Sequence, residues 1–200
     1  MLYRTIVADP PWPYSSTGAH LPDRSGGRNA DGRGANVSSS LRYGALSIDA
    51  LRALRPPVAD AAHLYLWTTN SFVVEAHEIA QAWGFAPKTI CTWTKVKADG
   101  SPSMKAGYYF RGATEHCLFA VRGSMRLQVS RGLPTAWLWP REPHSVKPDA
   151  FYDLVREASP GPYLELFAEE HRIALVSVAQ LADYRADTGA TPSSSRTLLL

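Results

Sequence analysis

The sequence predicts an α/β fold in which helices flank a mixed, mainly parallel sheet. Apolar, strand-like runs alternate with helix-like segments along the chain, and this order is typical of parallel sheets. A length of 200 residues suits one well-buried core, and a composition of 45% hydrophobic and 20% charged residues is that of a soluble globular protein. We therefore expect one domain over residues 1–187, followed by a disordered tail over residues 188–200.

The first half of the chain contains three predicted strands and two predicted helices. Ser47 is placed to cap the first helix and Gly84 to end the second. The strand segments are apolar or β-branched, which predicts that they are buried. In order, these elements are a strand at 5–8, a helix at 48–54, a strand at 63–67, a helix at 71–83 and a strand at 89–95.

The second half continues the alternation of strands and helices. Pro148 stands in the first turn of the predicted helix, where its missing N–H costs nothing. The elements are a strand at 115–121, a short candidate strand at 127–129, a helix at 148–158 and a strand at 163–167.

Two long segments without helix or strand pattern, residues 13–44 and 98–112, are expected to be mobile loops. They carry basic and aromatic side chains, which suit the phosphates and bases of a nucleic acid, so Arg42, Tyr43, Tyr108 and Arg111 are candidate substrate contacts. A disordered insertion is an equal alternative for the first segment, and an ordinary ordered loop is the alternative for the second.

The residues Asp9, Pro10, Pro11 and Trp12 directly follow the first strand, where ligands bind in open α/β sheets. The Asp9 carboxylate and the Pro10 carbonyl are two acceptors for the hydrogens of an exocyclic amine, which would free the amine lone pair for reaction. Pro11 keeps the turn rigid, while Trp12 and Tyr14 offer flat faces for a flipped base. A stiffened turn is the alternative without chemistry. The aromatic residue and the buried strand favour a catalytic site.

Further motifs follow in a fixed order along the chain. They are Leu64-Tyr65-Leu66-Trp67-Thr68-Thr69-Asn70, Trp83-Gly84-Phe85, Trp93-Thr94-Lys95, the segment 107–119 with Glu115-His116, His144-Ser145-Val146-Lys147-Pro148, and Leu164-Glu165-Leu166-Phe167-Ala168. Together with Asp9-Pro10-Pro11-Trp12 they resemble the MT-A70 family of S-adenosylmethionine-dependent adenine-N6 methyltransferases, over residues 3 to 172.

This resemblance implies a Rossmann-like methyltransferase fold in permuted order, with the catalytic motif first and the cofactor strand late. It implies that S-adenosylmethionine is the cofactor and that Lys147 contacts its carboxylate, at a helix start where an anion is favoured. The other cofactor contacts that it implies are Asp9, Ser145, Glu165, Phe167 and His171.

Each of these positions also has a purely structural interpretation. Lys147 could be a solvated surface lysine, Phe167 a core residue and His171 a structural histidine. Glu165 could tie the sheet together or face water. Glu115 and His116 are expected to pair within the sheet, with support of the second loop as the alternative, and Asn70 is expected to cap the following helix rather than line the cleft.

The chain departs from the family pattern at residues 169–180. The family usually ends in a strand with Trp and Gly-Asn that holds the adenosine of the cofactor, and this stretch contains neither. We therefore expect weaker cofactor binding than in members with the full ending, which calorimetry against such a member would test.

Charge and residue composition indicate which partners, ions and compartment the protein is expected to have. The net charge of +3 permits nucleic-acid binding without requiring it. Cys91 and Cys117 lie in apolar runs, so we expect buried free thiols in a reducing cytoplasm. We expect no metal site, because no Cys/His cluster has zinc spacing. We expect no membrane association and no signal peptide, because no apolar stretch is long enough and the chain begins with a predicted strand.

The sequence thus predicts methyl transfer to the N6 amine of adenine in nucleic acid. DNA is favoured over RNA, and the small size resembles bacterial or phage members of the family. The alternatives are a catalytically inactive nucleic-acid-binding scaffold subunit and a methyltransferase for another amine, such as cytosine N4 or a side-chain amide. Specificity would come from the two loops or from a partner chain in a homo- or heterodimer.

Overall fold

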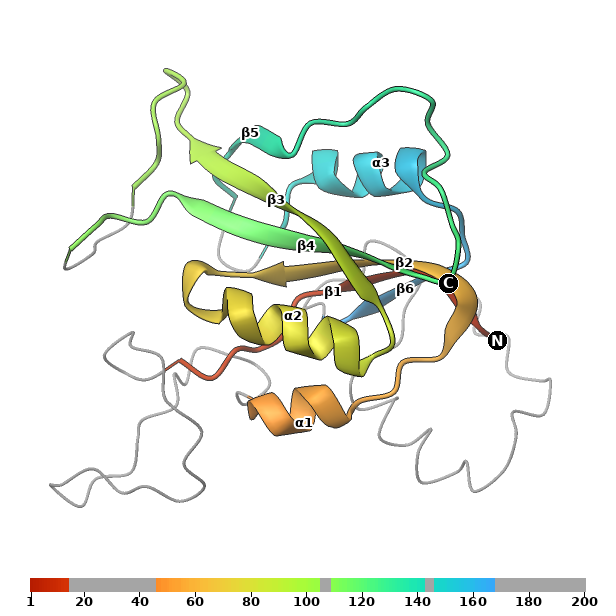
Figure 1. Cartoon of the computed structure of the whole chain (residues 1–200). Coiled ribbons are helices and arrows are strands. Elements are labelled where there is room, and N and C mark those ends of the chain that lie inside the picture. Colours follow the sequence, from red (N-terminus) through yellow and green to blue (C-terminus); the bar gives the residue numbers. More distant parts are fainter. Residues whose placement is uncertain (15–45, 105–108, 143–145, 168–200) are drawn as a thin grey trace, which may run out of the picture.

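A computed structural model of the chain describes residues 1–14, 46–104, 109–142 and 146–167, which form a six-stranded sheet flanked by helices (Figure 1). The strands are β1 (Tyr3–Ala8), β2 (Val58–Thr68), β3 (Ala86–Val96), β4 (Thr114–Arg122), β5 (Ala136–Pro140) and β6 (Tyr163–Leu166). The helices are α1 (Ile48–Ala53), the 3₁₀ turn η1 (Asn70–Phe72), α2 (Val73–Ala82) and α3 (Asp149–Ala158).

The sheet is mainly parallel, as predicted. Its strand order is β5-β3-β4-β2-β1-β6. β1 runs parallel to β2 and β6, and β3 runs parallel to β5, whereas β4 is antiparallel to both of its neighbours. All strands except β4 therefore end at the same edge of the sheet. Because β1 and β6 are neighbours, the carboxyl ends of the first and last described strands lie side by side at this edge.

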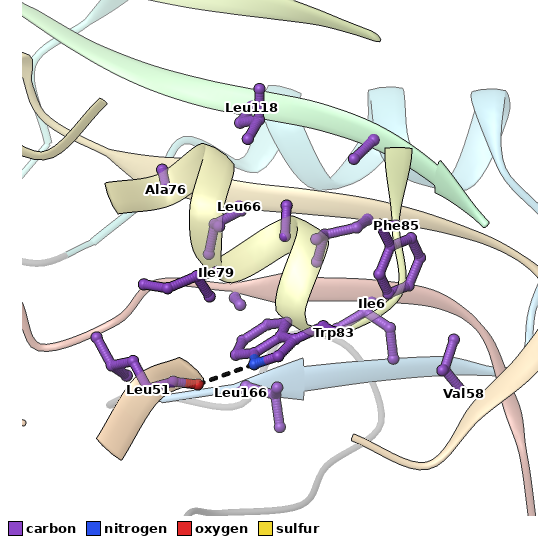
Figure 2. Packing of buried hydrophobic residues seen from close by; sticks show 14 of the residues in the cluster. Ile6, Leu51, Val58, Leu66, Ala76, Ile79, Trp83, Phe85, Leu118 and Leu166 are labelled. Carbon is purple, nitrogen blue, oxygen red and sulfur yellow. Dashed lines mark hydrogen bonds between the residues drawn. The ribbon is translucent and has the colours of Figure 1, made fainter. Parts of the chain in front are cut away.

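Two hydrophobic clusters cover the two faces of the sheet, in the three-layer arrangement of α/β folds. Alternation along the strands divides the side chains: Ile6 packs towards α1 and α2, and Val7 towards α3. In the first cluster the indole of Trp83 donates to the Leu51 carbonyl at 2.9 Å and so ties α2 to α1 (Figure 2). This packing fixes α1 and α2 against one face of the sheet.

The predicted start of α1 and the predicted stop after α2 are confirmed by the cap geometry. The Ser47 side chain accepts from the Ala50 backbone N–H at 3.1 Å, and Gly84 adopts a φ of 83° just after α2. The segment predicted as one helix from residue 71 instead begins with the 3₁₀ turn η1. Asn70 does not cap the helix, because its side chain contacts His116 and the residue before the turn is Thr69.

The strand predicted at 127–129 is wrong, and a real strand was missed. Residues 127–129 have no strand pairing, and the Gln128 N–H donates to the Ala158 carbonyl. The missed strand is β5, which is short and begins and ends close to Pro134 and Pro140. Prolines at both ends normally argue against a strand, and this one is tolerated at the edge of the sheet.

Cys91 and Cys117 are buried free thiols, as predicted, and lie opposite each other on β3 and β4. The predicted loop at 13–44 from residue 15 onward and the predicted tail at 188–200 lie outside the described residues. The limits of the domain remain a prediction.

Candidate active site

Strand alternation brings a set of charged side chains to one corner of the sheet. Asp9 comes two residues after Val7 of β1, so the two side chains lie on the same face of the sheet. In the same way, Glu115 lies on the face of Cys117 in β4, and Lys95 lies on the face of Trp93 in β3. All three therefore lie on the face that α3 covers. Lys147 joins them from the segment that leads into α3, so the site combines four separate parts of the chain.

Asp9 and Lys147 form the centre of this cluster. The Lys147 ammonium donates to the Asp9 carboxylate at 2.5 Å. Lys147 is 8% exposed, and its ammonium lies 5.1 Å from the centre of the Trp67 ring. The alternative of a solvated surface lysine is thereby wrong, because Lys147 is buried and paired.

Glu115 continues the cluster and shares its two oxygens between two lysines. One oxygen forms an ion pair with Lys95, and the other lies 3.4 Å from the Lys147 ammonium. The carboxylates of Asp9 and Glu115 and the ammoniums of Lys95 and Lys147 therefore balance in charge. We call these four residues the charge cluster.

Burial and pairing shift the protonation of the central groups. Burial raises the pKa of Asp9, although the neighbouring Lys147 opposes this effect. For Lys147, burial acts to lower the pKa, but the carboxylates of Asp9 and Glu115 outweigh it and the pKa is raised. Lys147 is thus a cation across the physiological range, and Asp9 is a better proton acceptor than an exposed aspartate.

The two prolines fold the chain sharply after β1. The Trp12 N–H donates to the Pro10 carbonyl and the Tyr14 N–H donates to the Trp12 carbonyl, both at 2.9 Å. The Pro10 carbonyl, predicted to accept from a target amine, therefore has one lone pair in use and one remaining. The Pro11 carbonyl accepts from the Leu46 N–H at 3.1 Å, which anchors the turn.

Trp12 does not have the exposed position that base stacking requires. It is 4% exposed, its ring stacks on Phe72 at 5.1 Å between ring centres, and its indole N–H donates to the Trp67 carbonyl at 3.2 Å. The stacking role predicted for Trp12 is therefore corrected to a core role. Apolar packing and a satisfied N–H hold the ring inside the protein.

Tyr14 is half-buried beside the same core. Its ring meets Phe72 edge-on at 4.9 Å, and its hydroxyl contacts the Thr69 hydroxyl. Burial raises the pKa of Tyr14, so the phenol is neutral at physiological pH. Tyr14 rather than Trp12 is the aromatic residue of this segment that keeps a partly accessible surface.

Glu165 and Phe167 lie at the end of β6, next to β1. Glu165 is 4% exposed and accepts from the Tyr152 hydroxyl at 2.7 Å, so it ties β6 to α3 and does not face water. Phe167 packs against the core that contains Ile6, and it has a φ of 69°, which is rare for a residue with a side chain. Backbone strain of this kind concentrates at functional sites. The Asp9 N–H donates to the Leu166 carbonyl just before it.

His116 lies on the opposite face of β4 from Glu115. Its ring nitrogens contact the Thr92 hydroxyl at 3.0 Å and the Asn70 side-chain oxygen. The expected pairing within the sheet is thus confirmed for His116, which links β4 to β3 and to η1. Burial lowers its pKa, so the ring is neutral near pH 7.

The remaining predicted contacts are mostly not described. Ser145, His171, Arg42, Tyr43 and Tyr108 lie outside the described residues. Arg111 is exposed in the connection between β3 and β4, beside Tyr109 and Phe110, which are 88% and 94% exposed. This connection leaves β3 at the edge of the sheet where the charge cluster lies.

Comparison with known proteins identifies the family. The sequence pattern of the MT-A70 family matches residues 3–180. The chain belongs to the MT-A70 family. A protein of Medicago truncatula named "Putative N(6)-adenosine-methyltransferase MT-A70-like" is 26% identical over 174 residues, which cover 84% of this chain and 24% of that protein. The chain thus spans about a quarter of the length of this curated relative. MT-A70 proteins are S-adenosylmethionine-dependent methyltransferases, and the predicted Rossmann-like fold is confirmed.

Two members of the charge cluster were not predicted as site residues. Lys95 was noted only as part of a motif, and Glu115 was expected to pair within the sheet, as it does with Lys95. Each stands two residues from a buried side chain of its own strand, Trp93 for Lys95 and Cys117 for Glu115. This spacing was a usable signal, because charged side chains on a buried face need partners. The strand register, in which Trp93 lies opposite Glu115, is what brings them together.

In the described parts of the chain, no helix is long and apolar enough to cross a membrane. No group of three or more His, Cys, Asp or Glu residues there is arranged to hold a metal ion.

Proposed function

We propose that the chain transfers a methyl group from S-adenosylmethionine to the N6 amine of adenine in nucleic acid, with DNA favoured over RNA. The observation that carries this proposal is the contact of the Asp9 carboxylate with the buried Lys147 ammonium at 2.5 Å. This contact places Asp9, an acceptor for the target amine, beside Lys147, a cation for the carboxylate of the cofactor. Both lie at the edge of the sheet where α/β proteins bind ligands. The name of the Medicago truncatula relative supports the same reaction.

The described residues fit the amino-acid end of this cofactor. Lys147 is the cation suited to its carboxylate, while Asp9 and Glu115 supply negative charge beside a cationic ligand. Trp67 adds a buried indole N–H that has no hydrogen-bond partner among the described residues, in the ring that lies next to the Lys147 ammonium. An unpaired buried donor is costly, and a polar ligand atom would satisfy it.

When bound, S-adenosylmethionine would supply an electrophilic methyl group, whose bond to sulfur breaks as the bond to the amine nitrogen forms, so that the cofactor would leave as a neutral thioether. Asp9 accepts a hydrogen bond from the target amine and holds its lone pair ready, and the remaining lone pair of the Pro10 carbonyl can accept the second hydrogen. Methylation leaves an extra proton on the amine nitrogen. Asp9 is the nearby acceptor for that proton, because burial raises its pKa.

The proposal also includes the binding partner, the oligomeric state and the cellular location. Nucleic acid is the partner that delivers adenine, and assembly as a homo- or heterodimer would supply further contacts to it. Light scattering of the purified chain, with and without oligonucleotide, tests this assembly. A cytoplasmic location suits Cys91 and Cys117, which are buried free thiols.

The test is methyl transfer from labelled S-adenosylmethionine to unmethylated DNA and to RNA, followed by digestion to nucleosides. We expect N6-methyladenine from the wild type and an activity about 100- to 1,000-fold lower in Asp9→Asn, because the side chain at position 9 loses its negative charge and can no longer take the proton from the amine. The matched control is Asp153→Asn, whose carboxylate is exposed on α3. No product from folded wild-type protein would reject the proposal and favour the nucleic-acid-binding scaffold. Another methylated nucleoside would identify a different amine.

A further inference from the structure

Lys95 is a buried lysine at the end of β3 whose burial needs an explanation. It is 7% exposed, its ammonium lies 4.5 Å from the centre of the Trp93 ring, and it forms an ion pair with Glu115. Removing a lysine from water is costly unless a partner compensates. Replacing such pairs by apolar side chains is often neutral or stabilising, so the ion pair is weak evidence for a role in stability alone.

The geometry of Glu115 gives Lys95 a connection to the site. One oxygen of Glu115 is held by Lys95, which leaves the other oxygen 3.4 Å from the Lys147 ammonium. Lys147 in turn donates to Asp9. The ion pairs therefore run in the order Lys95, Glu115, Lys147, Asp9, from β3 through β4 to the end of β1.

We propose that Lys95 is a positioning residue, which orients Glu115 so that Glu115 holds the Lys147 ammonium at Asp9. The inference rests on the proposed function, in which Lys147 binds the carboxylate of the cofactor. Lys95 acts through Glu115 and not on the ligand. Without that charge, Glu115 loses the ion pair that orients it, and its carboxylate can turn towards Lys147 and compete with the cofactor for that ammonium.

The experiment compares Lys95→Met with Lys95→Arg and with the control Lys97→Met. Methionine keeps the length and apolar stem of Lys95 but removes the charge, whereas arginine keeps the charge. Lys97 is an exposed lysine just beyond the end of the same strand. Initial rates are measured over a range of S-adenosylmethionine concentrations, and urea denaturation reports the stability of each variant.

We expect Lys95→Met to raise the KM for S-adenosylmethionine about 10- to 100-fold, the range that loss of one charged hydrogen bond produces. Its kcat should change less, Lys95→Arg should recover most of the loss, and Lys97→Met should match the wild type. The double variant Lys95→Met/Glu115→Gln should be no worse than Lys95→Met, because both changes break the same connection. A lower denaturation midpoint with an unchanged KM would overturn the proposal.

A second readout does not depend on activity. In protein with ¹⁵N-labelled lysine and no ligand, the Lys147 ammonium resonance should shift in Lys95→Met and stay in place in Lys97→Met. An unchanged resonance in Lys95→Met overturns the positioning role. If the wild type transfers no methyl group, the proposed function fails while this comparison still decides the role of Lys95.

Discussion

Replacing Trp12 separates a role in the core from a role in base stacking. The ring is 4% exposed and stacks on Phe72, and its N–H donates to the Trp67 carbonyl. Trp12→Phe keeps an aromatic face but loses the hydrogen bond, which costs about 1 kcal/mol. Trp12→Ala also loses the ring, and truncating a buried Trp or Phe costs about 3–5 kcal/mol. A loss of that size is a large share of the roughly 5–15 kcal/mol that stabilises a typical domain.

The assay is urea denaturation followed by circular dichroism, with the slope of the transition compared between variants. The matched control is Phe110→Ala, which truncates an aromatic side chain that is 94% exposed and should change the free energy of unfolding by less than about 0.5 kcal/mol. Under native conditions, Trp12→Phe should retain methyl transfer in proportion to its folded fraction. A Trp12→Ala protein as stable as the wild type but without transfer would refute the core role and restore base stacking.

Three further predictions concern the rest of the fold. Burial lowers the pKa of His63, so the contribution of this residue to stability is present above pH 6.5, the ordinary value of its pKa, and is lost as the pH falls below it. The urea concentration at the denaturation midpoint should therefore decrease when the pH is lowered from 7.5 to 5.5, and it should decrease less in His63→Gln. Tyr152→Phe removes the donor to buried Glu165 and should cost about 1.5–3 kcal/mol in a denaturation assay; no loss would mean that Glu165 has other sufficient partners. Gly123→Ala should destabilise by more than about 1 kcal/mol, because φ is 63° and the added Cβ would lie 2.3 Å from the Asp60 carbonyl oxygen. An unchanged melting temperature in Gly123→Ala would contradict that geometry.

The regular elements were predictable because local patterns determine them. Alternating apolar strands, the Ser47 cap and the Gly84 terminator each act within a few residues, and the structure confirms them. β5 was missed because it is short, with prolines at its ends, and only pairing with β3 makes it a strand. The 3₁₀ turn η1 was not predicted either, and Asn70 at its start contacts His116, a pairing that sequence spacing does not show.

Site residues were predictable where a sequence motif marks them and the fold also brings them together. They were not predictable where the buried packing alone determines the role of a residue. Asp9 and Lys147 stand in recognisable motifs, and the structure brings them into contact. Trp12 stands in the same motif as Asp9, but the preference of an indole for the core outweighs its position beside the catalytic acid. Lys95 and Glu115 became part of the site only through the register between β3 and β4, which no local pattern specifies.

The charge cluster acts as one unit, and this determines how each substitution should be interpreted. Lys147→Met would leave the Asp9 and Glu115 carboxylates near each other without the cation between them, so it combines a loss of binding with a loss of stability. Asp9→Asn leaves Lys147 with Glu115 and keeps an acceptor oxygen of similar shape at position 9. Its effect on the fold should therefore be smaller. For this reason the loss of transfer in Asp9→Asn, at unchanged denaturation midpoint, reports on the chemistry rather than on the burial of charge.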